Sequence, residues 1–184
     1  TVYVVFGNAT KSTRDNLDLD TLNGSNGGVK IVGPSGIGFG TKVKNIGDIN
    51  ADARDDFAIL APTALPVTGG SYSGVAYILF GTSSARMQTI DITTLNGDNG
   101  FTVHGASFDT TIVDYAGIED VAQAGDFNSD GIADFVLTQS QVVSGFTQLG
   151  ETSVIYGKSG SFSNMNNANL DTDLDGVNGF KIVG

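Results

Sequence analysis

The sequence contains no cysteine and only one histidine. Without cysteine the chain has neither a disulfide framework nor thiol chemistry. Zinc sites and His-dependent catalytic triads also lack the side chains that they require. The single histidine, His104, lies where related segments of the chain carry Val32 and Val183, so we expect it to be a strand residue. These absences predict a protein that is not an enzyme.

Basic residues are scarce as well. Lys and Arg number 9 against 20 Asp and Glu, which gives a formal net charge of −11. This balance excludes nucleic-acid binding, because phosphate contacts require clustered Lys and Arg. No segment approaches the ~18 consecutive apolar residues of a membrane-spanning helix, so we expect no membrane insertion.

Proline is rare, with 3 residues, whereas glycine is abundant, with 26 of the 184 residues. That is about twice the average usage of glycine, which is ~7%. Apolar residues make up 40% of the chain, and a chain of this length can bury a core. We therefore predict a folded, turn-rich protein.

Many of the acidic residues lie in two short loops, at 48–56 and 126–134. Each loop has oxygen-bearing side chains at positions 1, 3, 5 and 9: Asp48, Asn50, Asp52 and Asp56 in the first, and Asp126, Asn128, Asp130 and Asp134 in the second. Calcium prefers about six to eight oxygen ligands, which clustered carboxylates on a tight loop supply. Two loops in the same register are more than solvated turns, and we predict two calcium sites.

The loops are not EF-hands. An EF-hand has a bidentate Glu at its twelfth position, where these loops have Ile59 and Leu137. The residues after each loop are apolar and β-prone, so the predicted calcium loops lie between strands. A third acidic run, at 171–176, ends in Asp175-Gly176, which aligns with the turns at 23–24 and 96–97, and its ninth position is Gly179. We expect no calcium there.

The chain repeats three short segments in the same order. A strand-like segment that ends in an aromatic residue and glycine occurs at 3–7, 77–81 and 154–157. A Leu-Asn-Gly-x-Asn-Gly segment or a close variant follows at 22–27, 95–100 and 174–179, and a short apolar segment ending in glycine follows at 29–33, 101–105 and 180–184. One acidic loop lies between the first and second copies of this series, and the other lies between the second and third. Gly7 and Gly81 are 74 residues apart, a spacing that suits a four-stranded unit.

Each period is predicted to form four strands, and no segment shows a helical period. The strands are expected at about 38–46, 56–61, 74–80 and 101–104, and again at about 120–124, 134–137, 152–156 and 180–183. Residues 75–80 are almost continuously apolar, which indicates burial on both faces. Small sheets stacked face to face, as in a β-propeller, bury strands in this way.

We therefore predict an all-β fold, a β-propeller segment of about two and a half four-stranded blades. Residues 1–33 would form the last two strands of one blade. Residues 34–105 would form a blade with the first calcium loop, and residues 106–184 a blade with the second.

Motifs at both ends of the first acidic loop carry a resemblance to a known family. Phe39-Gly40 precedes the loop, and Leu60-Ala61-Pro62 follows it. Together they resemble the FG-GAP repeat of integrin α-subunit β-propellers and bacterial surface adhesins, whose pattern is Phe-Gly, an acidic calcium loop and Gly-Ala-Pro. The second copy departs from this pattern, with Ile118-Glu119 before its loop and Thr138-Gln139-Ser140 after it.

The resemblance implies that calcium is a structural cofactor. In the family the side chains at positions 1, 3, 5 and 9 bind the ion together with the backbone carbonyl at position 7, which is Arg54 here in the first loop and Ile132 in the second. It also implies an extracellular or cell-surface location and a role in adhesion or in cell-surface or matrix assembly, with a protein or glycan ligand on the propeller loops. Two alternatives remain open: a non-catalytic accessory domain of a secreted enzyme, and a structural spacer or filament-forming unit.

The predicted blade number has a consequence for assembly. Two and a half blades cannot close a propeller of ~4–8 blades. The first strand would lack its two inner partners, and the last blade would have a face without a neighbour. Such edges and faces invite pairing with another chain. We therefore expect this segment to be part of a larger protein or to associate with copies of itself.

Overall fold

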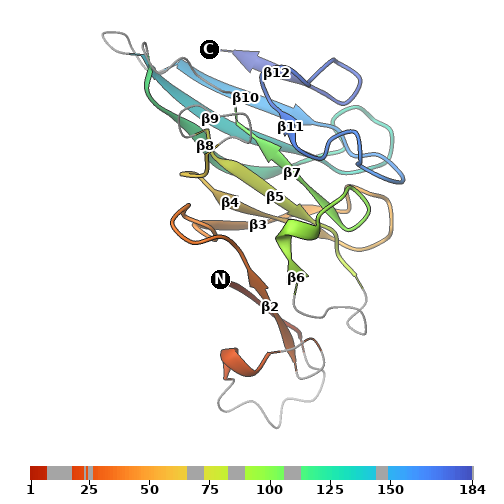
Figure 1. The fold of residues 1–184 in the computed structure, drawn as a ribbon. Coiled ribbons are helices and arrows are strands. Elements are labelled where there is room, and N and C mark those ends of the chain that lie inside the picture. The colour runs from red at the N-terminus through yellow and green to blue at the C-terminus, as the bar shows by residue number, and fades with distance from the viewer. Residues whose placement is uncertain are drawn as a thin grey trace. The chain divides into compact units, whose positions relative to one another are not determined.

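The computed structural model describes residues 1–7, 18–22, 24, 27–65, 73–82, 90–105, 113–143 and 149–183. Within them the structure is all-β, with 12 strands and 2 single-turn 3-10 helices (Figure 1). None of the helices in this part of the chain is long and apolar enough to cross a membrane. The chain divides into two compact units, one of Thr1–Pro34 with Thr82–Thr94 and the other of Ser35–Gly81 with Leu95–Gly184.

The first unit contains a three-stranded sheet. Its strand β1 (Val2–Val5) pairs antiparallel with β2 (Gly28–Val32), and β2 pairs parallel with the short β6 (Ile90–Asp91). The two 3-10 helices, η1 (Leu19–Thr21) and η2 (Ile92–Thr94), also belong to this unit. β1 lies at the edge of the sheet among the described strands.

The second unit contains two sheets, each built on four antiparallel strands. The β3–β7 sheet contains β3 (Lys42–Gly47), β4 (Asp56–Ala61), β5 (Val75–Leu79) and β7 (Gly100–His104). The β8–β12 sheet contains β8 (Val113–Gly125), β9 (Asp134–Val143), β10 (Leu149–Ile155) and β12 (Gly179–Val183). A further short strand, β11 (Ala168–Asn169), pairs parallel with β7.

The two short parallel strands occupy equivalent places in the repeat. β6 lies between β5 and β7 in the sequence but pairs with β2, whereas β11 lies between β10 and β12 but pairs with β7. Ile31 lies opposite Ile90 in one pairing, and Val103 opposite Ala168 in the other. Each of these sheets is therefore completed by residues of the following repeat.

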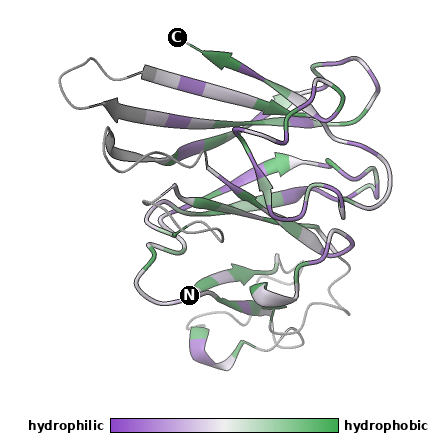
Figure 2. Ribbon diagram, turned by 45° about the horizontal axis from the view of Figure 1, so that its top comes forward, coloured by the Kyte–Doolittle hydropathy of each residue, from purple (hydrophilic) through white to green (hydrophobic). Residues whose placement is uncertain are grey.

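A core of large aromatic side chains lies in the second unit. Phe101 of β7 stacks on Phe162 with ring centroids 4.8 Å apart, and Phe135 of β9 lies 6.5 Å from Phe101. All three side chains are fully buried and belong to one hydrophobic cluster. β5 and β7 are buried along their whole length, which confirms the burial predicted from the apolar run. Figure 2 shows that hydrophobic residues lie on the strands of this unit, interspersed with hydrophilic ones.

The observed strands refine the predicted ones. β4 has the predicted bounds, but β3 begins at Lys42 rather than near residue 38, because Gly38 and Gly40 have positive φ and the Thr41 N–H donates to the Gly38 carbonyl across 3.1 Å. β8 and β9 are longer than predicted, since polar residues continue their ladder, with Gln139 opposite both Ile118 and Glu151. β6 and β11 were not predicted.

Candidate metal sites

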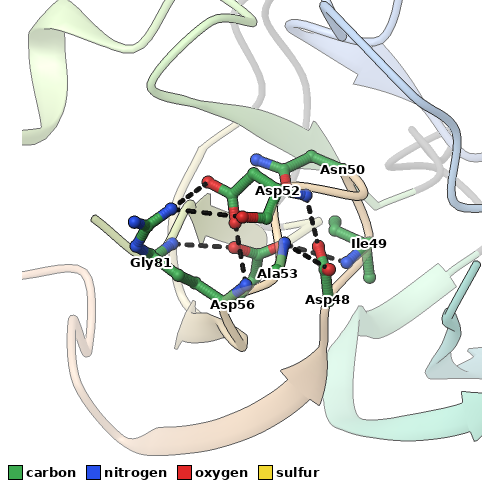
Figure 3. A network of polar contacts seen from close by, with 8 residues as sticks. Asp48, Ile49, Asn50, Asp52, Ala53, Asp56 and Gly81 are labelled. Atoms are coloured by element: carbon green, nitrogen blue, oxygen red, sulfur yellow. Dashed lines mark hydrogen bonds and ion pairs between the residues drawn. The ribbon is translucent and has the colours of Figure 1, made fainter. Parts of the chain in front are cut away.

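The first acidic loop closes on itself through its own side chains (Figure 3). It connects β3 to β4. The Asp48 carboxylate accepts hydrogen bonds from the Asp52 N–H at 3.0 Å and from the Ala53 N–H at 2.8 Å. Asn50 Oδ1 also accepts from the Asp52 N–H, at 3.0 Å. Asp52 Oδ1 accepts from the Arg54 N–H at 2.9 Å. The side chains at positions 1, 3 and 5 therefore fix the backbone of a tight turn.

The second acidic loop, between β8 and β9, has the same hydrogen bonds. Asp126 accepts from the Asp130 and Gly131 N–H groups, both at 2.9 Å. Asn128 Oδ1 accepts from the Asp130 N–H at 3.0 Å, and Asp130 Oδ1 accepts from the Ile132 N–H at 2.8 Å. The two predicted sites therefore share one loop structure, in the register that the sequence predicts.

The Asp at position 9 is the buried member of each set. Asp56 is 1% exposed and Asp134 is fully buried. Asp56 accepts from the Ile49 N–H at 2.9 Å and from the Gly81 N–H at 2.7 Å. Asp134 makes the equivalent bonds with the Phe127 N–H at 2.7 Å and the Gly157 N–H at 2.8 Å. These carboxylates join the start of each loop to the end of the third strand of its sheet.

Gly81 and Gly157 are site residues that the sequence reasoning missed. A Cβ at Gly81 would lie 2.4 Å from the Asp55 carbonyl oxygen, and one at Gly157 would lie 2.2 Å from that of Ala133. Only glycine lets the strand end come this close to the loop and donate to the position-9 carboxylate. The repeated aromatic-Gly segment was the available signal, because its glycine has no evident role within a strand.

The loop backbone is left-handed at positions 4 and 6 in both copies. Ala51 and Ser129 have φ of 61° and 64°, and Ala53 and Gly131 have φ of 65° and 88°. Gly adopts this region freely, whereas a residue with a Cβ is strained by about 1–2 kcal/mol. Ala53 therefore bears the penalty that Gly131 avoids.

The position-7 residues, whose carbonyls the resemblance assigns as ligands, lie on the same turns. The backbone N–H groups of Arg54 and Ile132 donate to the position-5 carboxylates, as described above. The Arg54 guanidinium also donates to the Asp52 carbonyl at 3.1 Å and lies 3.8 Å from Asp52 Oδ2. Arg54 thus offsets part of the negative charge of the first loop from its exposed side.

The carboxylates of the first loop influence one another electrostatically. Burial raises the pKa of the Asp56 carboxyl to about 6, hydrogen bonds from Gly81 and Ile49 oppose this shift, and the negative charges of Asp52 and Asp48 add to it. A bound cation would lower the electrostatic cost of keeping this carboxylate charged.

The donor set fits calcium by its chemistry. In the described parts of the chain, no three His, Cys, Asp or Glu side chains converge closely enough to hold a metal ion. The predicted ligand sets do not depend on three such side chains alone, because they also include Asn50, Asn128 and backbone carbonyls. Each carboxylate has about four lone-pair sites, and the hydrogen bonds to Asp48 and Asp126 occupy only part of them. These oxygens can therefore hold the turn and bind a hard cation as well.

The third acidic run forms a turn, as predicted. Asp175 Oδ1 accepts from the Val177 N–H at 2.9 Å, and Asn96 Oδ1 accepts from the Asp98 N–H at 3.0 Å in the preceding repeat. Asp171, in the same run, lies 2.8 Å from Lys181 Nζ. The carboxylates of this run thus stabilise a turn and an ion pair.

His104 is a residue of β7, as predicted, and is 8% exposed. Burial lowers its pKa, so the ring is neutral at pH 7.

Neither the protein-family models nor the curated proteins compared with this chain match it.

Proposed function

We propose that this chain is a calcium-stabilised β-propeller segment of FG-GAP type. The observation that carries the proposal is the matching set of backbone hydrogen bonds to the side chains at positions 1, 3, 5 and 9 of the two acidic loops, each with a buried Asp at position 9. Calcium supplies a positive charge that offsets the clustered carboxylates. The ligands are Asp48, Asn50, Asp52, Asp56 and the Arg54 carbonyl in one loop, and Asp126, Asn128, Asp130, Asp134 and the Ile132 carbonyl in the other.

The propeller architecture has support from the sheets of the second unit. They are four-stranded antiparallel meanders that pack face to face, each with an acidic loop between its first and second strands. The motifs that flank the first loop lie side by side, because the Gly40 N–H donates to the Leu60 carbonyl at 3.0 Å. Stacked small sheets of this kind are the unit of a propeller.

We further propose that the protein acts outside the cell, in adhesion or in cell-surface or matrix assembly, and that it is not an enzyme. Calcium modules of extracellular proteins work with dissociation constants of about 10⁻⁴–10⁻³ M, so extracellular calcium would load such loops. The absence of cysteine agrees with a fold stabilised by metal rather than by disulfides.

Thermal unfolding in millimolar Ca²⁺ and in EDTA tests the calcium sites. With free Ca²⁺ at about 100 times its dissociation constant, one site adds ~2.7 kcal/mol. Two sites should therefore raise the melting temperature by on the order of 10–20 °C. An equal midpoint in both buffers would contradict the proposal.

Isothermal titration calorimetry with Asp52→Asn and Asp130→Asn assigns the ions to the loops. Asparagine keeps an oxygen for the backbone hydrogen bond but removes the charge, so each variant should lose one of two binding events. Asp175→Asn is the matched control, because it introduces the residue that stands at positions 23 and 96. It should retain both events.

A further inference from the structure

Glu151 is a buried carboxylate that the acidic loops do not use. It lies on β10 and is 7% exposed. In the preceding repeat the equivalent residue is Val75, because both stand four residues before the strand end that faces Gly100 or Gly179. Burying a carboxylate where the fold otherwise places valine costs free energy unless partners compensate the charge. The partners of Glu151 should therefore explain why a charged residue stands here.

Two side chains on the same face of the β8–β12 sheet contact Glu151. Gln139 lies opposite it on β9, and Gln139 Nε2 donates to Glu151 Oε1 at 2.7 Å. Lys181 lies opposite Ser153 on β12, and its Nζ is 3.8 Å from the same Oε1. Directly and diagonally opposed residues of paired strands share one face. Gln139 thus holds the carboxylate of Glu151 beside the amine of Lys181.

A second carboxylate contacts the same amine. Lys181 Nζ donates a hydrogen bond to Asp171 Oδ1 at 2.8 Å. The Asp171 N–H donates to Asn169 Oδ1 at 2.7 Å, and the N–H of the preceding Leu170 donates to the His104 carbonyl at 2.9 Å. The pairing of β12 with β10 holds the backbone of Lys181. The backbone that carries each member of this pair is therefore fixed.

An amine and a carboxyl group held together in this way can condense to an amide. Placing two reacting groups side by side in one structure can correspond to an effective concentration of about 10⁵–10⁸ M. A lysine amine is a nucleophile once its proton has been removed. The reaction also needs a group that passes protons near the reacting atoms, and Glu151 is in that position.

We propose that Lys181 and Asp171 form an intramolecular isopeptide bond, with Glu151 as the group that moves the protons. The hydrogen bond to Asp171 raises the pKa of Lys181 and burial opposes this shift, so the pair begins as ammonium and carboxylate. One proton passes from Nζ to the Asp171 carboxylate, which leaves a neutral amine and a carboxylic acid.

The remaining steps balance without an oxidant, a reductant or a co-reactant. Lys181 Nζ attacks Cγ of Asp171, and a C–N bond forms. Glu151 takes the second proton from Nζ after a small movement of its side chain and gives it to the departing hydroxyl. The C–O bond breaks, one water leaves, and Glu151 is again a carboxylate.

The bond links the two sheets of the second unit. Asp171 follows β11, which pairs with β7 of one sheet, whereas Lys181 belongs to β12 of the other. The covalent link therefore prevents β12 from being pulled away from the segment that covers β7. It does not depend on the calcium sites, because none of its residues is a predicted calcium ligand.

The first unit contains a matched pair that lacks the third group. Lys30 stands at the place of Lys181 in the repeat, and its Nζ lies 3.5 Å from Asp20 Oδ1. Thr1 stands at the place of Glu151. In the part of the chain that the structure describes, Asp20 is the only carboxylate that forms an ion pair with Lys30. Lys30 and Asp20 should therefore remain an ion pair.

Mass spectrometry of a tryptic digest of the denatured 184-residue chain tests the proposal. Trypsin cleaves after Lys and Arg, and neither occurs between Lys158 and Lys181. An amide on Lys181 Nζ blocks cleavage there, so the bonded chain should yield residues 159–184 as one peptide, lighter by one water, about 18 Da. The chain without the bond yields residues 159–181. Cleavage after Lys30 should be complete in both cases.

Two variants test the roles of the residues. Lys181→Arg keeps a positive charge but removes the nucleophile, because a guanidinium does not lose its proton in proteins. Glu151→Gln keeps the size of the side chain but cannot carry the proton. Both should retain the full mass of the chain. Glu119→Gln is the matched control, since Glu119 is an exposed glutamate of β8 in the same sheet, and it should form the bond as the wild type does.

The digest of the wild-type chain needs no variant, so it decides the proposal even where a substitution prevents folding. Cleavage after Lys181 with no loss of mass overturns the bond and leaves the calcium sites untouched. A loss of water that persists in Lys181→Arg overturns it as well, because the water then comes from other residues. Bond formation at the wild-type rate in folded Glu151→Gln overturns the role of Glu151.

Discussion

At the scale of single residues, the sixth position distinguishes the two acidic loops. Ala53 and Gly131 have the same left-handed backbone, but only the alanine is strained by its Cβ. Ala53→Gly should therefore raise the free energy of unfolding by up to about 1 kcal/mol, and Gly131→Ala should lower it by about 1 kcal/mol. Urea unfolding in Ca²⁺ measures both values. Shifts of the same sign for the two substitutions would contradict the assigned strain.

The glycines that end the third strands provide a second prediction. Gly81→Ala and Gly157→Ala place a Cβ against backbone atoms of the neighbouring loop, which cannot move aside as a flexible side chain can. Each substitution should lower the free energy of unfolding by roughly 2–3 kcal/mol and weaken calcium binding to the loop it contacts, which calorimetry would detect.

Gly7→Ala is the matched control for these two variants. Gly7 ends the same repeated segment, but a Cβ there would have no heavy atom of the described residues within 4 Å. Its substitution should change stability by no more than about 0.5 kcal/mol. A loss as large as that of Gly81→Ala would mean that the close approach is not the reason for the repeated glycine.

The residues of the candidate sites were predictable to different degrees. The spacing of side-chain oxygens identified the loop positions, because a tight turn needs them at fixed intervals. Nothing in the sequence indicated the left-handed conformation of Ala51 and Ser129, since the residue that usually marks this conformation is glycine. The hydrogen bonds from Gly81 and Gly157 depend on strand pairing across more than 20 residues of sequence, which local patterns do not encode.

At the scale of strands and sheets, the buried aromatic core should contribute more to the free energy of unfolding than exposed aromatic side chains do. Phe101→Ala removes a fully buried ring that stacks on Phe162, and it should lower the free energy of unfolding by about 3–5 kcal/mol. Phe127→Ala is the control of identical chemistry at a side chain that is 56% exposed, with an expected loss below about 1 kcal/mol. Equal losses, measured by urea unfolding, would mean that these rings do not form the core described above.

The strands were predictable where they are apolar and where their partners are close in sequence. β4 and β5 met both conditions. The polar halves of β8 and β9 did not, because Thr, Gln and Ser carry no burial signal even when backbone pairing continues through them. β6 and β11 are two residues long and pair with strands of the preceding repeat, so neither periodicity nor local turn chemistry marks them.

At the scale of the whole molecule, both acidic loops belong to the second unit. Calcium should therefore slow amide hydrogen exchange chiefly in that unit, at β4 and β9, because ligand binding raises the free energy of opening where the ligand contacts the chain. β1 and β2 of the first unit should exchange at similar rates in Ca²⁺ and in EDTA. Hydrogen-exchange mass spectrometry makes this comparison, and equal protection of both units would contradict it.

The parallel pairing of β11 with β7 has a consequence for protein synthesis. On the ribosome, His104 emerges 65 residues before Asn169, its partner in this pairing. At about 5–20 residues per second, the nascent β7 waits roughly 3–13 s for the strand that covers its edge. A chain that stalls or is cleaved in this interval presents an open strand edge to its surroundings. Each newly made repeat thus covers a strand edge of the repeat translated before it. The direction of translation therefore sets the order in which these edges are paired and can no longer aggregate.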